Sequence, residues 1–316
     1  MRVIRGAEAV DEPLLRPVLT VGNFDGIHLG HQAILATVVG RARVLRGQAV
    51  VYTFEPHPRK VLQPERAPGL LVTLEQKLEL LEEAGVDAVV VEPFSLEFAK
   101  TSAEHFVRHL LHERVQPLEV YVGYDFHFGR DREGSMRTLT ELGPRLGFAV
   151  TIIPEVTVDQ GDVNSTRIRE VLAAGGVQQA NSMLGRPYAV RGTVVKGQQR
   201  GRSLDFPTAN LDAENEVLPA VGVYAGFLSL LDEGEPRRAS RWPAVTNVGR
   251  RPTFDDDDAV VVEAHCLDFD GDLYGRRVDL SFLHHLREER RFPGVDALRA
   301  QIRSDVEDGR RLLESF

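Results

Sequence analysis

The fold of the first half of this chain follows from one segment, Gly22-Asn-Phe-Asp-Gly-Ile-His-Leu-Gly-His31. The apolar run at residues 17–21 precedes it and a helical pattern follows it, so the segment lies where a strand ends and a helix begins. Glycines at such a turn let a phosphate group approach the backbone closely. The free N–H groups of a helix N-terminus attract anions. The segment therefore predicts a nucleotide-binding turn.

The two imidazoles of this segment, His28 and His31, would project into the same place and could donate hydrogen bonds to phosphate oxygens. Other interpretations stay open from the residues alone. A His-x-x-His pair is also typical of zinc sites, although no third ligand stands nearby in the sequence. Either histidine taken singly is equally an ordinary residue of a first helical turn.

Around this segment, the first half alternates strand-like and helix-like stretches. Helical patterns are introduced by two predicted capping boxes, Thr73 with Gln76 and Thr101 with Glu104. The apolar runs that predict strands lie at residues 17–21, 49–54, 86–91, 118–122 and 149–153. Strands that alternate with helices predict an α/β domain with a parallel sheet.

The pattern changes in the second half, where strand-like runs follow one another with only turn residues between them. These runs lie at residues 188–195, 221–230, 244–248, 260–269 and 277–282. They predict an all-β domain, a small barrel, closed by a C-terminal helix in which Val295, Leu298, Ile302 and Val306 recur at helical spacing. We place the boundary near residues 182–186, with domains at 1–185 and 186–316.

Composition narrows the function classes. The chain has 316 residues, 42% of them hydrophobic, which suffices for two domains with separate cores. A net charge of −9 disfavours nucleic-acid binding, and the single cysteine, Cys266, excludes an internal disulfide and a four-cysteine metal site. No apolar stretch approaches the roughly 18 residues of a membrane span. We expect a cytoplasmic protein that binds neither membrane nor nucleic acid; its oligomeric state is unknown.

A second chemical pattern is the segment from Val195 to Asn210. Its cations are Lys196, Arg200 and Arg202, and it is not a Walker A loop because its glycines are one residue too close together. Within Pro207-Thr-Ala-Asn210, the hydroxyl of Thr208 and the amide of Asn210 could hold one face of a hydrated Mg²⁺. Alone, the tetrapeptide would more often be a turn.

Two acidic features are ambiguous. Strand alternation places Glu263 and His265 on one face, and from alternation alone Glu263 is either a solvated residue or one retained for chemistry. The acidic run at residues 255–258 could suggest a metal site, but a solvated loop is the simpler interpretation.

The segment 22–31 resembles the nucleotide-binding signature of the nucleotidylyltransferase superfamily, and its Phe-Asp-Gly version resembles bacterial FAD synthetases. Three further segments support this resemblance. Residues 54–58 resemble the family's loop beside the flavin, residues 122–129 resemble its flavin-pocket segment, and residues 164–169 resemble its second phosphate motif, with Asn164 in place of a serine. The resemblance implies a Rossmann-like fold with the ATP phosphates on the histidine pair.

The resemblance also implies further contacts in this half. Implied nucleotide contacts are Gly22, Asn23, Phe24, Asp25, Gly30, Ser165, Thr166 and Arg169. Implied flavin contacts are Phe54, Pro56, His57, Pro58, Gly123, Asp125, Phe126 and Phe128. Several of these residues have simpler interpretations: Ser165 is also a good helix N-cap, and Phe126 and Phe128 could be core residues.

In the second half, Pro207-Thr-Ala-Asn210 looks like the signature of riboflavin kinases, with Asp205 in place of the usual glycine. The resemblance continues through residues 222–225, 247–254, 262–265, 272–275 and 286–292. It implies a six-stranded barrel, ATP phosphates near Lys196, Arg200 and Arg202, Mg²⁺ on Thr208 and Asn210, and Glu263 as the general base. Arg287 and Phe292 are implied flavin contacts.

On these motifs the chain is identified as a member of the bacterial bifunctional riboflavin kinase/FAD synthetase family. The resemblance implies that riboflavin and MgATP give FMN, and that FMN and a second ATP give FAD and pyrophosphate. Two alternatives are an adenylyltransferase for another cofactor and a non-catalytic flavin-binding protein. The barrel signature argues against the first alternative, and the intact His28, His31 and Glu263 argue against the second.

Overall fold

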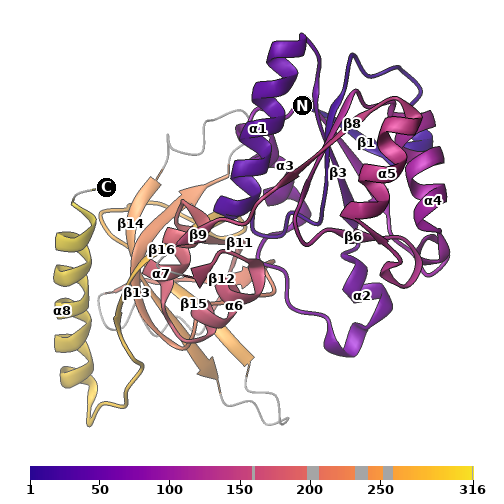
Figure 1. Ribbon diagram of the computed structural model, residues 1–316. Coiled ribbons are helices and arrows are strands. Elements are labelled where there is room, and N and C mark those ends of the chain that lie inside the picture. Colours follow the sequence, from indigo (N-terminus) through magenta and orange to yellow (C-terminus); the bar gives the residue numbers. More distant parts are fainter. Residues whose placement is uncertain (159–160, 198–205, 232–240, 252–258, 315) are drawn as a thin grey trace. The chain divides into compact units, whose positions relative to one another are not determined.

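The computed structural model describes residues 1–158, 161–197, 206–231, 241–251, 259–314 and 316 (Figure 1). They form two compact units, Met1–Asn164 and Ser165–Phe316. Within these residues, no helix has both the length and the apolar character needed to cross a bilayer. The acidic run at 255–258 lies outside the described residues.

The first unit contains a six-stranded sheet in the order β1-β4-β3-β2-β5-β8, and all neighbouring strands are parallel. The strands are β1 (Arg2–Arg5), β2 (Val18–Val21), β3 (Ala49–Glu55), β4 (Ala88–Pro93), β5 (Glu119–Gly123) and β8 (Ala149–Ile153). This confirms the predicted parallel sheet. Strand β1 was not predicted, because only two apolar residues stand between its arginines.

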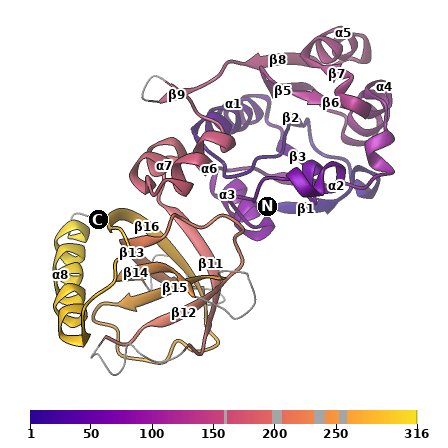
Figure 2. The same cartoon turned by 90° about the horizontal axis from the view of Figure 1, so that it is seen from below.

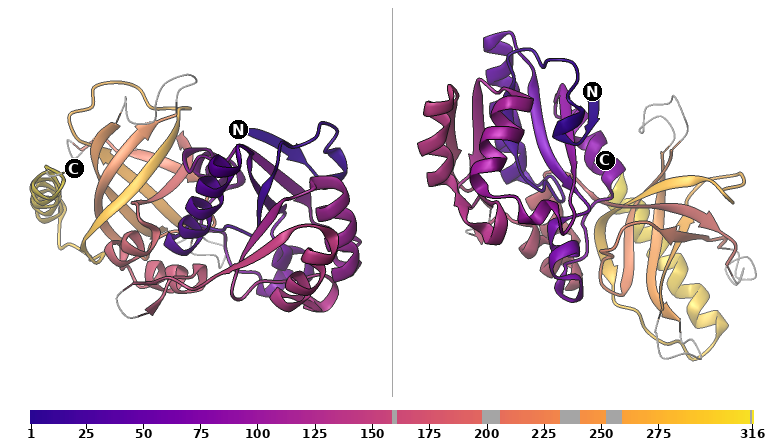
Figure 3. Two further views of the ribbon diagram at one scale, coloured as in Figure 1. Left: turned by 45° about the horizontal axis from the view of Figure 1, so that its top comes forward. Right: turned by 90° about the vertical axis from the view of Figure 1, so that its right-hand side faces the viewer.

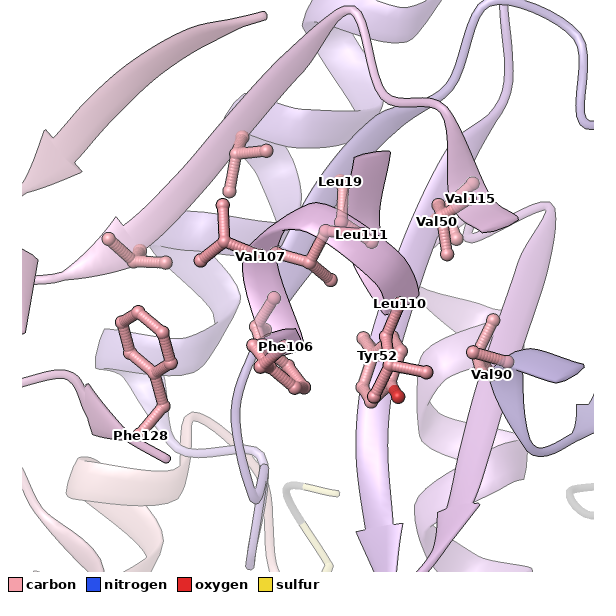
Figure 4. Packing of buried hydrophobic residues seen from close by; sticks show 14 of the residues in the cluster. Leu19, Val50, Tyr52, Val90, Phe106, Val107, Leu110, Leu111, Val115 and Phe128 are labelled. Atoms are coloured by element: carbon pink, nitrogen blue, oxygen red, sulfur yellow. The ribbon is translucent and has the colours of Figure 1, made fainter. Parts of the chain in front are cut away.

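Helices cover both faces of this sheet (Figure 3). One face carries α1 (Leu29–Leu45) and α3 (Leu74–Glu83); the other carries α5 (Met136–Leu146) and α4 (Ala103–His105), which continues as the π-helical stretch η4 (Phe106–Val115). Successive side chains of β3 point to opposite faces of the sheet and pack against the two helical layers. Val51 packs with Leu35 and Leu81, whereas Val50 and Tyr52 pack with η4 (Figure 4).

Shorter elements complete the first unit. They are the helix α2 (Pro58–Leu62), the 3-10 turns η1 (Ala7–Ala9), η2 (Pro64–Arg66), η3 (Phe98–Lys100) and η5 (Arg130–Arg132), and the ribbons β6 (His127–Phe128) with β7 (Gly134–Ser135) and β9 (Thr157–Val158) with β10 (Gly161–Asp162).

One of the two predicted capping boxes is confirmed. Thr73 Oγ1 accepts from the Gln76 backbone N–H at 3.1 Å, and Gln76 Oε1 accepts from the Thr73 N–H at 2.9 Å. The box at Thr101 and Glu104 is wrong. Ser102 is the N-cap, with its Oγ accepting from the His105 N–H at 3.1 Å, because Thr101 closes the preceding turn η3.

The second unit is a closed antiparallel barrel in the order β11-β12-β15-β14-β13-β16, and β11 pairs with β16 (Figure 2). The strands are β11 (Tyr188–Val195), β12 (Ala209–Ala213), β13 (Gly222–Leu230), β14 (Arg241–Arg251), β15 (Ala259–Cys266) and β16 (Arg277–Arg287). The expected six-stranded barrel is confirmed. Strand β12 was not among the predicted runs, because its sequence Ala-Asn-Leu-Asp-Ala has no continuous apolar stretch.

Among the described residues, three helices accompany the barrel. The predicted C-terminal helix is α8 (Val295–Leu313), which lies on the outer face of the barrel, where Leu313 packs with Ala225, Phe227 and Leu283. Helices α6 (Ser165–Ala173) and α7 (Val177–Leu184) precede β11. The side chain of Asn181 joins α7 to the barrel, donating to the Phe282 carbonyl at 2.8 Å and accepting from the Tyr188 N–H at 2.7 Å.

The position of α7 tests where the second domain begins, because the predicted boundary after residue 185 leaves out this helix. We expect a fragment of residues 165–316 to be several kcal/mol more stable than a fragment of residues 186–316. The shorter fragment loses both Asn181 bonds and the burial of Val177, Met183 and Leu184, which are fully buried and contribute about 1.5–3 kcal/mol each. Urea unfolding of the two fragments measures the difference. Equal stabilities would show that α7 is no part of the barrel core.

Candidate functional site

The predicted site residues of the first unit gather at one edge of the sheet. Strand order reverses between β2 and β5, and in such sheets ligands bind outside the carboxyl ends of the strands at that point. The segment 22–31 follows β2, Phe54 lies near the end of β3, and Gly123 ends β5. The structure thus brings together segments that lie about a hundred residues apart in the chain.

His28 is the N-cap of α1 and its Nδ1 accepts a hydrogen bond from the His31 backbone N–H at 3.4 Å. Because Nδ1 accepts, the ring proton sits on Nε2. The two imidazoles stack with their centroids 3.7 Å apart. Gly30 permits this arrangement, since a Cβ there would lie 3.1 Å from the His28 ring. The predicted pair is therefore a single unit at a helix N-terminus.

The turn that carries the two histidines is held in place by buried contacts of its own residues. Phe24 and Ile27 have φ of 50° and 40°, a region that costs free energy for residues other than glycine. Phe24, 1% exposed, packs into the core, and the Asp25 carboxylate accepts from the Leu71 N–H at 3.0 Å. Burial lowers the pKa of the nearby Lys77 ammonium, while the Asp25 carboxylate opposes this shift.

The other predicted nucleotide contacts lie in different surroundings. Asn23 is exposed and its carbonyl accepts from the Thr53 hydroxyl at 3.3 Å. A Cβ on Gly22 would lie 3.1 Å from the Phe24 ring. Ser165, Thr166 and Arg169 begin α6 and belong to the second unit, so their predicted role at the phosphates stays a prediction.

The two predicted flavin segments meet in one aromatic cluster. Phe106 joins them: its ring centroid lies 6.5 Å from that of Phe54 and 5.4 Å from that of Phe128, which itself stacks on Phe126 at 5.3 Å (Figure 4 labels Phe106 and Phe128). Phe94 contacts Phe54 at 5.9 Å. Phe94 and Phe106 were not among the predicted members of this cluster. The place of Phe94 directly after a strand was the signal that could have found it.

The remaining predicted flavin contacts surround this cluster. Asp125 and Pro56 are exposed, and the Glu55–Pro56 peptide bond is cis. His57, 8% exposed, caps α2, with its Nδ1 accepting from the Arg59 N–H at 3.2 Å, and Pro58 begins that helix.

In the barrel, strand register places the predicted kinase residues in one row. Glu263 of β15 lies directly opposite Asn210 of β12 and Asn247 of β14. The flanking Val262 and Ala264 are each 2% exposed and face the interior, so the half-buried Glu263 faces outward. Directly opposed residues share a face of the sheet, and the row is therefore Asn210–Glu263–Asn247 on the outer surface.

The segment before β12 approaches this row closely. A Cβ on Gly197 would lie 2.3 Å from the Asn210 amide nitrogen, so only glycine leaves room for that amide. Thr208 is half-buried and Lys196 is exposed. Arg200, Arg202 and Asp205 lie outside the described residues.

The chemistry of Thr208, Asn210 and Glu263 suits a hard cation that keeps few protein ligands. Thr208, Asn210 and Glu263 carry only oxygen or amide donors, the type that Mg²⁺ prefers. Among the described residues, no three histidine, cysteine, aspartate or glutamate side chains are grouped to hold a metal by themselves. A Mg²⁺ held jointly with substrate phosphates fits this donor set.

Arg287, a predicted flavin contact, makes a bidentate ion pair with Asp305 of α8. Its Nε and Nη2 lie 2.9 and 2.8 Å from the carboxylate oxygens, and its guanidinium carbon is 5.7 Å from the Phe292 ring centroid. Asp305, 4% exposed, also accepts from the Gln301 amide at 2.7 Å. Asp305 was not among the predicted site residues, although an aspartate on the apolar face of a helix is a visible signal in the sequence.

Comparisons with known proteins match both units. A family model described as FAD synthetase matches residues 12–167, and one described as riboflavin kinase matches residues 184–313. The bifunctional riboflavin kinase/FMN adenylyltransferase of Pseudomonas fluorescens is 39% identical over 99% of this chain and 98% of the relative. The protein of that name from Haemophilus influenzae is 36% identical over 100% of both chains. A crystal structure of a Streptococcus pneumoniae protein described as a macrolide-efflux protein matches with a TM-score of 0.87 and 29% identity, covering 98% of this chain and 99% of that one.

The ion pair of Arg287 predicts a stability effect. Asp305→Ala leaves the guanidinium partly buried without its partner, and we expect it to lower the free energy of unfolding of the second unit by about 3 kcal/mol. Asp308→Ala is the control on the same helix, because its pair with Arg311 is exposed and should contribute less than about 1 kcal/mol. Urea denaturation of the full chain measures both. Equal losses of unfolding free energy in Asp305→Ala and Asp308→Ala would show that the buried pair is no more important for stability than the exposed one.

Proposed function

The chain belongs to the family of bifunctional riboflavin kinase/FMN adenylyltransferases, and we propose how its residues divide the two reactions. The enzyme phosphorylates riboflavin to FMN with one ATP and adenylates FMN to FAD with a second ATP. Adenylation belongs to residues 1–185 and phosphorylation to residues 186–316. The ranges of the two family models, 12–167 and 184–313, support this division. We place the reactions in the cytoplasm, in keeping with the single cysteine.

The observation that carries the kinase assignment is the row Asn210–Glu263–Asn247. In our proposal, Glu263 accepts the proton of the ribityl 5′-hydroxyl as that oxygen attacks the γ-phosphorus of ATP. The new O–P bond forms while the bond from the γ-phosphorus to the β-bridging oxygen breaks, and ADP leaves. The outward direction of Glu263 supports this role, because a substrate hydroxyl can reach it.

The oxygen atoms of Thr208 and Asn210 would hold Mg²⁺ beside this carboxylate. When bound, the ion would neutralise charge on the phosphates. Gly197 contributes by leaving space for the Asn210 amide, and the exposed Lys196 is free to reach a phosphate oxygen. Arg200 and Arg202 belong to the same proposal on their sequence position alone. Flavin contacts at Arg287 and Phe292 would come from the end of β16 and the residues after it.

For adenylation, we assign the transition-state contacts to His28 and His31. A phosphate oxygen of FMN attacks the α-phosphorus of ATP, and the bond from that phosphorus to pyrophosphate breaks. The His28 Nε2–H and the amides at the start of α1 would stabilise the charge that develops on the phosphates. Ser165, Thr166 and Arg169 would add contacts. Phe54 and Phe128 are buried in the core, and the half-buried Phe126, which stacks on Phe128, would offer its apolar ring to the flavin.

Substitution of Glu263 tests the kinase assignment. Glu263→Gln keeps the size and hydrogen bonding of the side chain but cannot take a proton at neutral pH. We expect riboflavin phosphorylation to fall about 10²–10⁴-fold while MgATP binding persists. Conversion of supplied FMN to FAD by the same preparation should be unchanged, which controls for misfolding. A kinase rate within a few-fold of the unaltered enzyme would make Glu263 an ordinary surface residue.

Two substitutions of His28 separate catalysis from helix capping. Asparagine is a good N-cap, so His28→Asn keeps an acceptor for the His31 N–H, while it removes the Nε2–H donor and the ring that stacks on His31. We expect both His28→Asn and His28→Ala to slow FAD formation roughly 10²–10³-fold, with FMN accumulating from riboflavin. If His28→Asn instead made FAD at the normal rate, capping alone would account for His28.

A further inference from the structure

His265 lies two positions after Glu263 on β15 and therefore on the same outward face. Its Nδ1 is 2.8 Å from the carbonyl oxygen of Pro207, the residue immediately before Thr208. A carbonyl oxygen only accepts hydrogen bonds, so Nδ1 carries the proton and donates. His265 thus links the strand of the general base to the segment that carries the metal-holding residues.

This bond lies where the strand pairing ends. The ladder between β12 and β15 joins Leu211 to Val262, Asn210 to Glu263 and Ala209 to Ala264, and it goes no further. If it continued, Thr208 would lie opposite His265. Instead the His265 side chain reaches one residue further and holds the carbonyl of Pro207, which has no N–H of its own with which to extend a ladder.

The ring of His265 is also supported on its side. Phe206 meets it edge to face, with the ring centroids 5.5 Å apart and the planes at 87°. Pro207 itself is exposed, so its carbonyl could turn to water if the imidazole were absent. Thr208 lies between this bond and the first ladder pair at Ala209, and both its neighbours are therefore fixed.

We propose that His265 is a positioning residue of the kinase reaction, which sets the direction of the Thr208 and Asn210 oxygens relative to Glu263 through its bond to Pro207. The inference rests on the proposed roles of these three residues. It assigns no contact between His265 and the substrates.

Two amide substitutions test this role, because they place a donor at different distances from the backbone. In His265→Asn, the amide nitrogen lies near the place of Nδ1 and can still reach Pro207. In His265→Gln, the amide nitrogen lies near the place of Nε2 and cannot reach the Pro207 carbonyl. We expect His265→Gln to raise the MgATP KM and the MgADP dissociation constant roughly three- to tenfold, the effect of one lost hydrogen bond. His265→Asn should stay within about twofold, and both variants should convert FMN to FAD normally.

Amide hydrogen exchange supplies a readout apart from substrates. Peptides covering residues 206–211 should exchange faster in His265→Gln than in His265→Asn or the unaltered enzyme. Impairment of His265→Asn alone would point to a direct role of Nε2 and overturn the proposal. Equal impairment of both variants would assign the effect to packing against Phe206. Normal behaviour of both variants would show that the bond to Pro207 positions nothing. Either of these results would also overturn the proposal.

The parallel variant Thr208→Ala distinguishes a failure of this inference from a failure of the proposed function. Unaltered MgADP binding in Thr208→Ala would refute the assignment of Thr208 itself. The exchange rates then decide whether His265 holds Pro207, since they do not depend on any ligand.

Discussion

Strand register is the constraint on which the proposed kinase site depends. Successive side chains of a strand point to opposite faces, so a slip of one residue between β12 and β15 would turn Glu263 into the barrel and Ala264 out of it. Closure of the barrel through β11 and β16 prevents such a slip, because every strand is held on both sides. The row Asn210–Glu263–Asn247 is thus a consequence of the whole barrel and of no single segment.

In the first unit, the candidate site is positioned by the edge of the parallel sheet and not by strand register. A parallel sheet brings the ends of β2, β3 and β5 to one edge, and the turn at residues 22–31 is then shaped by its own buried contacts. Phe24 in the core and Asp25 bonded to Leu71 hold a backbone with positive φ, and this fixes the direction in which α1 begins. The direction of α1 in turn sets the position of His28, which caps the helix and is the proposed donor to the phosphates.

Helix α8 is held on the barrel by apolar packing and by one ion pair. The helix packs on the outer side of β13, β14 and β16, and the Arg287–Asp305 pair joins it to the end of β16. A buried ion pair contributes little net stability, but it strongly penalises any arrangement that separates its partners. The pair therefore fixes the place of the chain after β16, where Phe292 is proposed to meet the flavin.

Local patterns determined what the sequence alone could predict. The capping box at Thr73, the alternation of strands and helices, and the two predicted phosphate motifs each depend on residues a few positions apart. Such short-range interactions act in the same way whatever the rest of the chain does. The bond of His265 to Pro207 and the pair of Arg287 and Asp305 depend on long-range pairing and helix packing. Only tertiary structure decided these contacts, because no local pattern fixes which distant segments share a face.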